Sequence, residues 1–181
     1  MITNFKLFNE NLSVNENLLV PRNLEGRKEK RKQMNIRLLS QEVIDGDLEL
    51  DESFMDIDPK FVKLKKVNGY VHLTGDQWTE IPEWLKYVEI KGSFCCSNNN
   101  LTTLKNCPQN IGNSLLCYNN ELISLEGCPK NIARSFYCSY DKLTSLEGCP
   151  EFIGGDFWCY GNKVKLKLPD YVKLKGYFKN K

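Results

Sequence analysis

The chain has 181 residues, 41% of them hydrophobic and 27% charged, and a formal net charge of +2. That length suits one domain with an appendage, and the near-neutral charge excludes a protein that binds its partners through bulk electrostatics alone. No apolar run reaches the roughly 18 residues that a membrane-spanning helix needs.

Residues 1–21 contain one lysine and no unbroken apolar stretch, so they make a poor secretory signal. We expect them to form a flexible leader. Without a signal, the expected location is the cytoplasm, whose reducing environment keeps most of the eight cysteines as free thiols.

Charge is segregated in the segments that follow. Residues 22–42 are basic, and the apolar spacing within them predicts a helix over residues 27–43 that caps the rest of the chain. Residues 43–58 hold seven acids and no base, and residues 164–181 hold six lysines. This segregation predicts a poled molecule that can orient a charged partner, or two solvated ends without a partner.

Residues 43–163 repeat along the chain, and the repeat is regular over residues 90–163. Two series of cysteines recur every 21 residues: Cys96, Cys117, Cys138 and Cys159, and Cys107, Cys128 and Cys149. We number each turn from the residue two before the first kind of cysteine. Position 1 is Phe94, Leu115, Phe136 or Phe157; position 6 is Asn99, Asn120, Asp141 or Asn162; position 8 is Leu101, Leu122, Leu143 or Val164; position 18 is Ile111, Ile132 or Ile153.

The repeat continues in weaker form on both sides of its regular part. Val71, Leu73 and Trp78 match positions 1, 3 and 8 of an earlier turn, with about two extra residues before the next turn. The lysine-rich residues 164–181 match a truncated last turn, which we expect to cap the C-terminal end.

These motifs resemble the leucine-rich repeat, whose core signature is L-x-L-x-x-N-x-L, in its short bacterial form. The segments "SLEGCP" and "F-x-C" are similar to repeats of some phage and bacterial proteins. The resemblance implies a repeat solenoid of mixed or mostly β structure, with a curved parallel sheet, a convex side of turns and 3₁₀ segments, and an N-terminal capping helix. The leader motif "NFKLFNE" is similar to N-terminal segments of large tailed-phage proteins, which implies a phage origin and a bacterial host cytoplasm.

The repeat assigns a direction to each side chain. Each turn contributes a short strand at positions 1–5, and strands of successive turns stack at ~4.8 Å, with positions 1 and 3 inward and positions 2 and 4 outward. A position-6 amide can pair backbone groups of adjacent turns that would otherwise be buried without partners. One turn cannot bury its own apolar side, so the stack forms the core.

The cysteines fit packing better than metal, disulfides or catalysis. Zinc sites use closely spaced Cys pairs, whereas these cysteines are far apart in the sequence and form lines along the stack. Thiols in register point in parallel, which disfavours disulfides. We therefore expect no metal and no cofactor, and a structural core that includes Cys96, Cys107, Cys117, Cys128, Cys138, Cys149, Cys159, Asn99, Asn120 and Asn162.

One cysteine differs from the others because it faces outward. Cys95 occupies position 2, as does His72 one turn earlier, so the two side chains are expected to be neighbours. A Cys–His dyad would also need an oxyanion site, which the sequence does not supply. We expect two residues on a binding surface, and no enzymatic activity.

Outward positions gather aromatic residues toward the C-terminal half of the repeat. The expected partner-binding residues are Leu116, Tyr118, Tyr137, Tyr140, Lys142, Trp158, Tyr160 and Lys163. Tyr and Trp are favoured in protein interfaces, and a contiguous apolar patch on a protein surface marks a partner site. The alternative is that these rings only shield the sheet.

The expected function is therefore that of a protein-binding module, for example a phage- or bacterium-encoded inhibitor or adaptor. Two other functions stay open. The basic residues 22–37 and the lysine and aromatic side chains suit nucleic-acid binding. A structural, virion-associated component is the third possibility.

Overall fold

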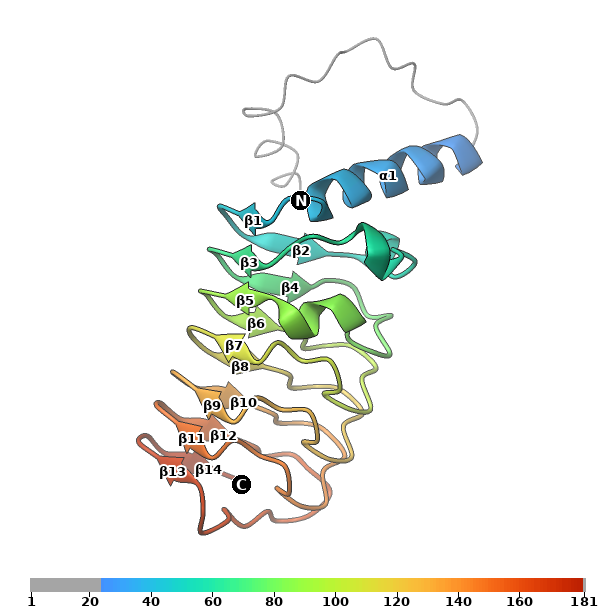
Figure 1. The fold of residues 1–181 in the computed structure, drawn as a ribbon. Coiled ribbons are helices and arrows are strands. Elements are labelled where there is room, and N and C mark those ends of the chain that lie inside the picture. The colour runs from blue at the N-terminus through green and yellow to red at the C-terminus, as the bar shows by residue number, and fades with distance from the viewer. Residues whose placement is uncertain (1–23, 181) are drawn as a thin grey trace.

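The computed structural model describes residues 24–180 and shows a parallel β-solenoid of seven turns with one N-terminal helix (Figure 1). The expected leader lies outside these residues. A seven-stranded sheet runs the length of the stack, and every strand pairs in parallel with the next turn. Its strands are β2 (Leu48–Leu50), β4 (Val71–Leu73), β6 (Phe94–Cys95), β8 (Leu115–Leu116), β10 (Phe136–Tyr137), β12 (Phe157–Trp158) and β14 (Phe178–Lys179).

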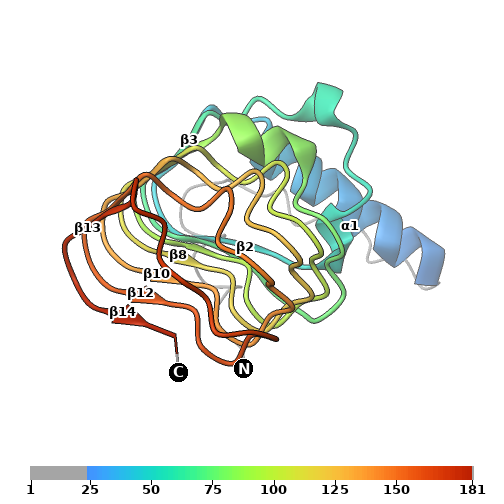
Figure 2. The same cartoon turned by 90° about the horizontal axis from the view of Figure 1, so that it is seen from below.

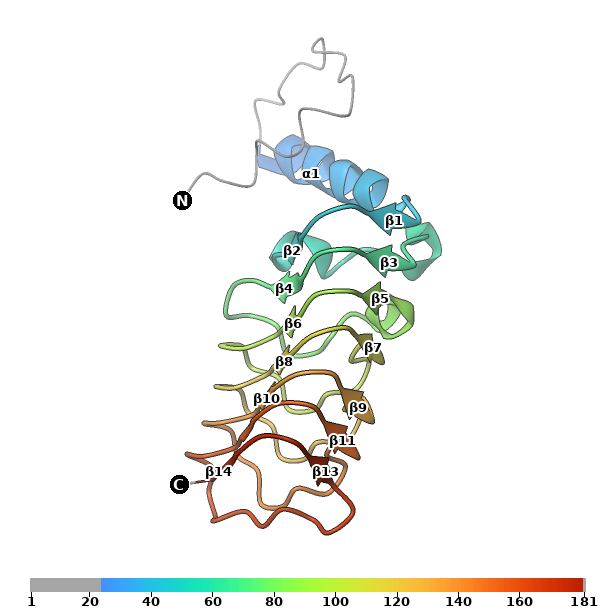
Figure 3. The same ribbon diagram turned by 90° about the vertical axis from the view of Figure 1, so that its left-hand side faces the viewer.

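A second row of short strands lies beside this sheet. In each turn the chain bends between its strand of the second row and its strand of the long sheet, and we call this bend the corner (Figure 3). It consists of β1 (Val43–Ile44), β3 (Lys66–Val67), β5 (Glu89–Ile90), β7 (Asn110–Ile111), β9 (Asn131–Ile132), β11 (Phe152–Ile153) and β13 (Lys173–Leu174). The row is divided between β7 and β9 into a sheet of four strands and a sheet of three. Part of the return path that the sequence left to turns, extended pieces and 3₁₀ segments is therefore a β ladder.

Viewed down the stack, the turns superpose, so the inward side chains form columns (Figure 2). The position-1 column from Val71 to Phe157 is buried, and Phe136 stacks on Phe157 with ring centroids 5.0 Å apart. The apolar residues at position 18 and at position 11 (Leu104, Leu125 and Leu146) are also buried, so each turn covers the apolar side of the turn before it. Val164, which the repeat assigned to inward position 8, is 47% exposed, and Leu166, two residues later, is buried instead.

Turn length changes along the stack. Equivalent residues are 23 apart in Leu48, Val71 and Phe94, and 21 apart from Phe94 onward. In the described part of the chain, all three 3₁₀ helices lie in the longer turns: η1 (Glu52–Phe54), η2 (Pro59–Phe61) and η3 (Glu83–Tyr87). The two extra residues in each longer turn of the solenoid supply the length for these helices. In the 21-residue turns of the solenoid, the chain returns through tight backbone turns instead.

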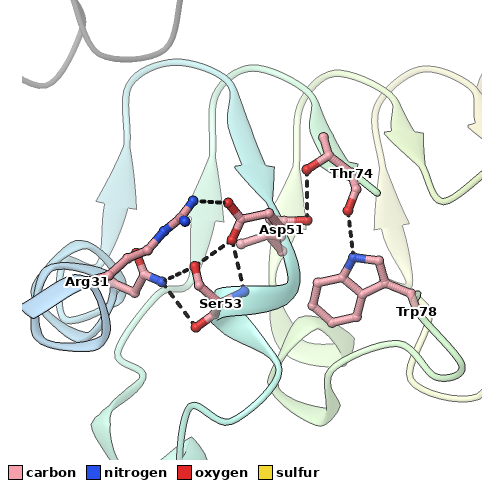
Figure 4. A network of polar contacts seen from close by, with 7 residues as sticks. Arg31, Asp51, Ser53, Thr74 and Trp78 are labelled. Atoms are coloured by element: carbon pink, nitrogen blue, oxygen red, sulfur yellow. Dashed lines mark hydrogen bonds and ion pairs between the residues drawn. The ribbon is translucent and has the colours of Figure 1, made fainter. Parts of the chain in front are cut away.

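Helix α1 (Leu24–Leu39) packs on the first turn of the solenoid. Its side chain Asn35 is buried and donates to the Ser53 hydroxyl at 2.8 Å, and Arg31 pairs with Asp51 (Figure 4). Leu39 is buried in the core. The helix ends four residues before the expected boundary, because Val43 begins β1. No helix within residues 24–180 is long and apolar enough to cross a membrane.

The corner between the two rows of strands is a column of backbone hydrogen bonds. Gly69 donates to the carbonyl of Gly46, and Gly92 donates to that of Gly69 at 2.9 Å. A Cβ added to Gly92 would lie 2.6 Å from the Gly69 carbonyl oxygen, so the absence of a side chain permits this close approach. The corner therefore sets the orientation of the long sheet, and of its outward face, relative to the second row of strands.

Candidate binding face

The outward side of the seven-stranded sheet carries one row of position-2 side chains. Strand register places them in the order Glu49, His72, Cys95, Leu116, Tyr137, Trp158 and Lys179. The three N-terminal residues of the row are ionisable, whereas Tyr137 and Trp158 nearer its C-terminal end are aromatic and are followed by Lys179. Two chemically different regions therefore share one face.

The aromatic region forms an open pocket of about 430 Å³, which we call the tyrosine pocket. It is lined by Asn98, Tyr118, Asn119, Tyr137, Ser139, Tyr140, Trp158 and Tyr160. Five of the eight expected partner-binding residues are thus brought together. Leu116, Lys142 and Lys163 lie outside the lining, and Lys142 pairs with Glu121.

The rings of the pocket support one another. Trp158 lies 5.8 Å from Tyr137 and 6.0 Å from Tyr160, measured between ring centroids, and Tyr140 meets Tyr160 edge-on at 5.1 Å. The ammonium of Lys179 lies 4.5 Å from the Trp158 ring centroid. These contacts hold the rings in place before any partner arrives and put a positive charge at the pocket's edge.

The position-4 side chains create the hollow. Tyr118, Ser139 and Tyr160 follow one another in successive turns, so a small residue sits between two large ones. Ser139 is 4% exposed, and its hydroxyl finds no hydrogen-bond partner among residues 24–180; the same holds for the Trp158 indole nitrogen. Buried polar atoms without partners are uncommon in folded proteins and are costly, so these two atoms reduce the stability of the fold beside the pocket.

Position 5 has a left-handed backbone in every regular turn. Asn98, Asn119 and Gly161 have φ of 58°, 56° and 71°, and the fourth residue of this kind is Tyr140 at 57°. Glycine and asparagine tolerate this conformation, whereas a bulky residue adopts it at a cost. Tyr140 is also 56% exposed, so the chain places a strained aromatic ring on the rim of the pocket.

Sequence reasoning missed four residues of this region: Asn98, Asn119, Ser139 and Lys179. The sequence did mark Asn98 and Asn119, because position 5 is Gly or Asn in all turns from Val71 to Gly161 except that of Tyr140. This composition is typical of a left-handed backbone. Ser139 was marked more weakly, as the small residue between two tyrosines. Lys179 reaches Trp158 through the pairing of β12 with the last strand.

The expected core residues line the interior of the stack. Cys96, Cys107, Cys117, Cys138, Cys149 and Cys159 are buried and Cys128 is half-buried; all eight cysteines lie within the described residues and are free thiols. Burial raises the pKa of each of these seven thiols, that of Cys159 to about 12. They are therefore protonated and poorly nucleophilic near neutral pH.

The position-6 amides form a hydrogen-bonded ladder through the stack. The side chain of Asn120 accepts from Leu101 N at 3.0 Å and donates to the carbonyls of Cys96 and Cys117. Asn99 and Asn162 make equivalent bonds. Asp141 accepts from two backbone N–H groups through one oxygen, and its other oxygen is buried without a partner within the described chain.

Within residues 24–180, no group of three or more His, Cys, Asp or Glu side chains is placed to hold a metal ion. Comparisons of the chain with protein-family models, with curated protein sequences and with solved structures find no match. The class that the fold defines is therefore the parallel β-solenoid, and the candidate site is the outward face of its long sheet.

Proposed function

We propose that this protein is a non-enzymatic binding module of leucine-rich-repeat type, which holds another protein on the tyrosine pocket. The repeat signature and the aromatic composition of the face support the assignment. A phage- or bacterium-encoded inhibitor or adaptor is the role that suits a small module of this kind.

The observation that carries the proposal is the tyrosine pocket itself. Four tyrosines and one tryptophan converge on one surface, packed against one another and partly open to solvent. Aromatic anchors around a recess are typical of the centre of a protein interface. The strained rim residue Tyr140 adds to this, since strain concentrates at functional sites.

Nucleic-acid binding is the second candidate, because Lys179 lies over the aromatic row and bases stack on such rings. The basic helix α1 packs on the first turn, whereas Tyr137 and Trp158 of the pocket come from β10 and β12 further along the stack, so the helix and the pocket would not form one continuous groove (Figure 1). Binding through phosphates would weaken steeply as salt rises, whereas an aromatic protein interface would tolerate salt.

The test is affinity capture from the native host with the wild-type protein and with the double variant Tyr137→Ala/Trp158→Ala, followed by quantitative mass spectrometry. We expect a protein that the wild type retains and the variant loses by at least about tenfold, since truncation of interface anchors costs about 2 kcal/mol or more each. Equal retention by both proteins would contradict the proposal.

A second variant separates loss of binding from loss of folding. Tyr140→Asn places at position 5 the residue found at Asn98 and Asn119, which relieves the strained backbone. We expect its midpoint of thermal unfolding to be equal to or above that of the wild type while partner retention falls. Retention that follows thermal stability in all variants would indicate a structural effect instead.

A further inference from the structure

The N-terminal half of the outward row contains a cluster that the proposed function does not use. Glu49, His72 and Cys95 come from β2, β4 and β6 and are paired in register, Glu49 with His72 and His72 with Cys95. Neighbouring parallel strands are ~4.8 Å apart, so each side chain is within reach of the next. All three are half-buried, and the register of β4 with β6 places the thiol of Cys95 beside the imidazole of His72.

We propose that Cys95, held against His72 in this row, is the reactive thiol of the protein and a site of covalent modification by small-molecule disulfides. The carboxylate of Glu49, on the other side of His72, positions the imidazole and favours its protonated form. This arrangement places a nucleophile, its proton partner and an orienting carboxylate on three consecutive turns.

The electrostatics of the cluster agree with its geometry. Partial burial raises the pKa of Cys95, but the favourable interactions of its thiolate with His72 and with neighbouring Ser97 outweigh burial, so the pKa lies below the ordinary value of 9.0. The bond to Cys95 raises the pKa of His72 above 6.5 against the opposing effect of burial, and the charge of Glu49 adds to the rise. Near neutral pH the pair therefore gains thiolate–imidazolium character.

The residues around Cys95 and His72 do not oppose the thiolate–imidazolium form of the pair. On the far side β8 presents the apolar Leu116, and Cys96, next in the chain, points inward. Tyr70 donates to Glu49 at 3.3 Å, and Asp47 adds negative charge near Tyr70. The negative charge of Glu49 favours the imidazolium form of His72.

The contrast with the other thiols makes the site selective. The seven remaining cysteines point into the stack, and burial raises the pKa of each. Among the eight, Cys95 combines an outward position with a basic partner. Cys128, which is also half-buried, is the matched comparison.

The reaction is a thiol–disulfide exchange. The Cys95 thiolate attacks one sulfur of a disulfide RSSR, a new S–S bond forms to Cys95, and the S–S bond of RSSR breaks. The leaving thiolate RS⁻ takes the proton of the His72 imidazolium and departs as RSH, which leaves the imidazole neutral. A free thiol reverses the modification.

The test is the reaction of the native protein with 5,5′-dithiobis(2-nitrobenzoate), followed by absorbance and by intact and peptide mass spectrometry. We expect one fast equivalent per chain, mapped to Cys95, with a pH–rate midpoint below that of N-acetylcysteine in the same buffer. Cys95→Ser should abolish the fast phase, and Cys128→Ser should leave it unchanged.

His72→Gln should slow the fast phase about tenfold at pH 7 and move its midpoint upward, because the thiolate loses its counter-charge. A fast phase on another cysteine, or a wild-type midpoint at or above that of N-acetylcysteine, would overturn the proposal. If His72→Gln does not fold, the pH–rate midpoint of the wild-type protein, compared with that of N-acetylcysteine, still tests the proposal. None of these results depends on the tyrosine pocket, so the outcome is separate from that of the proposed function.

Discussion

At the scale of single residues, Asp141 is the point where the repeat departs from its own rule. A carboxylate stands in the amide ladder, and its second oxygen lies where the neighbouring amides donate to carbonyls. Burial raises the pKa of Asp141 to about 7, although the N–H groups of Leu122 and Asn120 oppose the shift. Near neutral pH the fold therefore carries either a buried charge or a proton that it must bind.

Asp141→Asn is expected to stabilise the fold by about 1–3 kcal/mol at pH 7 and above, because the amide restores the missing donor. Between pH 3.8 and about 7, the folded wild type binds one more proton at this site than the unfolded chain, so its stability falls as pH rises. Urea unfolding at several pH values measures both effects. The difference between wild type and variant should grow with pH across this window, and a constant difference would show that Asp141 is not the titrating group.

At the scale of elements, the corner column predicts unequal effects of the same substitution. Gly92→Ala puts a Cβ 2.6 Å from the Gly69 carbonyl oxygen, whereas a Cβ on Gly46 meets nothing within 4 Å. We expect Gly92→Ala to destabilise the protein by about 1–3 kcal/mol through forced backbone shifts. Chemical denaturation compares it with the control Gly46→Ala, which should be nearly neutral. Similar losses in both would show that glycine flexibility, and not close approach, matters at the corner.

The elements also show which parts of the structure could be predicted from the sequence. The long sheet and its inward columns follow from the repeat, whose positions 1 and 3 are apolar from Phe94 to Cys159, and the cap follows from the apolar spacing of residues 27–43. The second row was not foreseen because the Cys-Pro steps and the glycines after Ile111 and Ile153 favour turns in this part of the repeat. The aromatic residues of the pocket were foreseen from alternation, but its floor was not, since Ser139 gains its meaning from Tyr118 and Tyr160 in adjacent turns.

At the scale of the whole molecule, contacts run between neighbouring turns, so stability should vary along the stack. The central turns are sealed on both sides. In the last turn the apolar residues Leu168, Val172, Leu174 and Phe178 are partly buried, and lysines crowd the same segment. This end should therefore open before the centre.

Native-state hydrogen exchange tests that gradient. We expect the amides of β6, β8 and β10 to exchange most slowly and those of β13 and β14 fastest among the strands, with α1 protecting the first turn. The expected ratio is at least about tenfold, which corresponds to about 1.4 kcal/mol in opening free energy. Equal protection in all turns would mean that the solenoid opens as one cooperative unit.

The uniform step between turns has a consequence for how such a molecule can change. Because equivalent residues contact one another from turn to turn, a copied 21-residue segment can be spliced in without altering any inward column. Inserting a copy of residues 94–114 after residue 114 would keep an equivalent of Asn98 beside the tyrosine pocket and shift the pocket away from the His72–Cys95 pair by one strand spacing, about 4.8 Å. Insertion of whole turns would therefore increase the distance between these two surface sites in multiples of the strand spacing, while the structure of each site is retained.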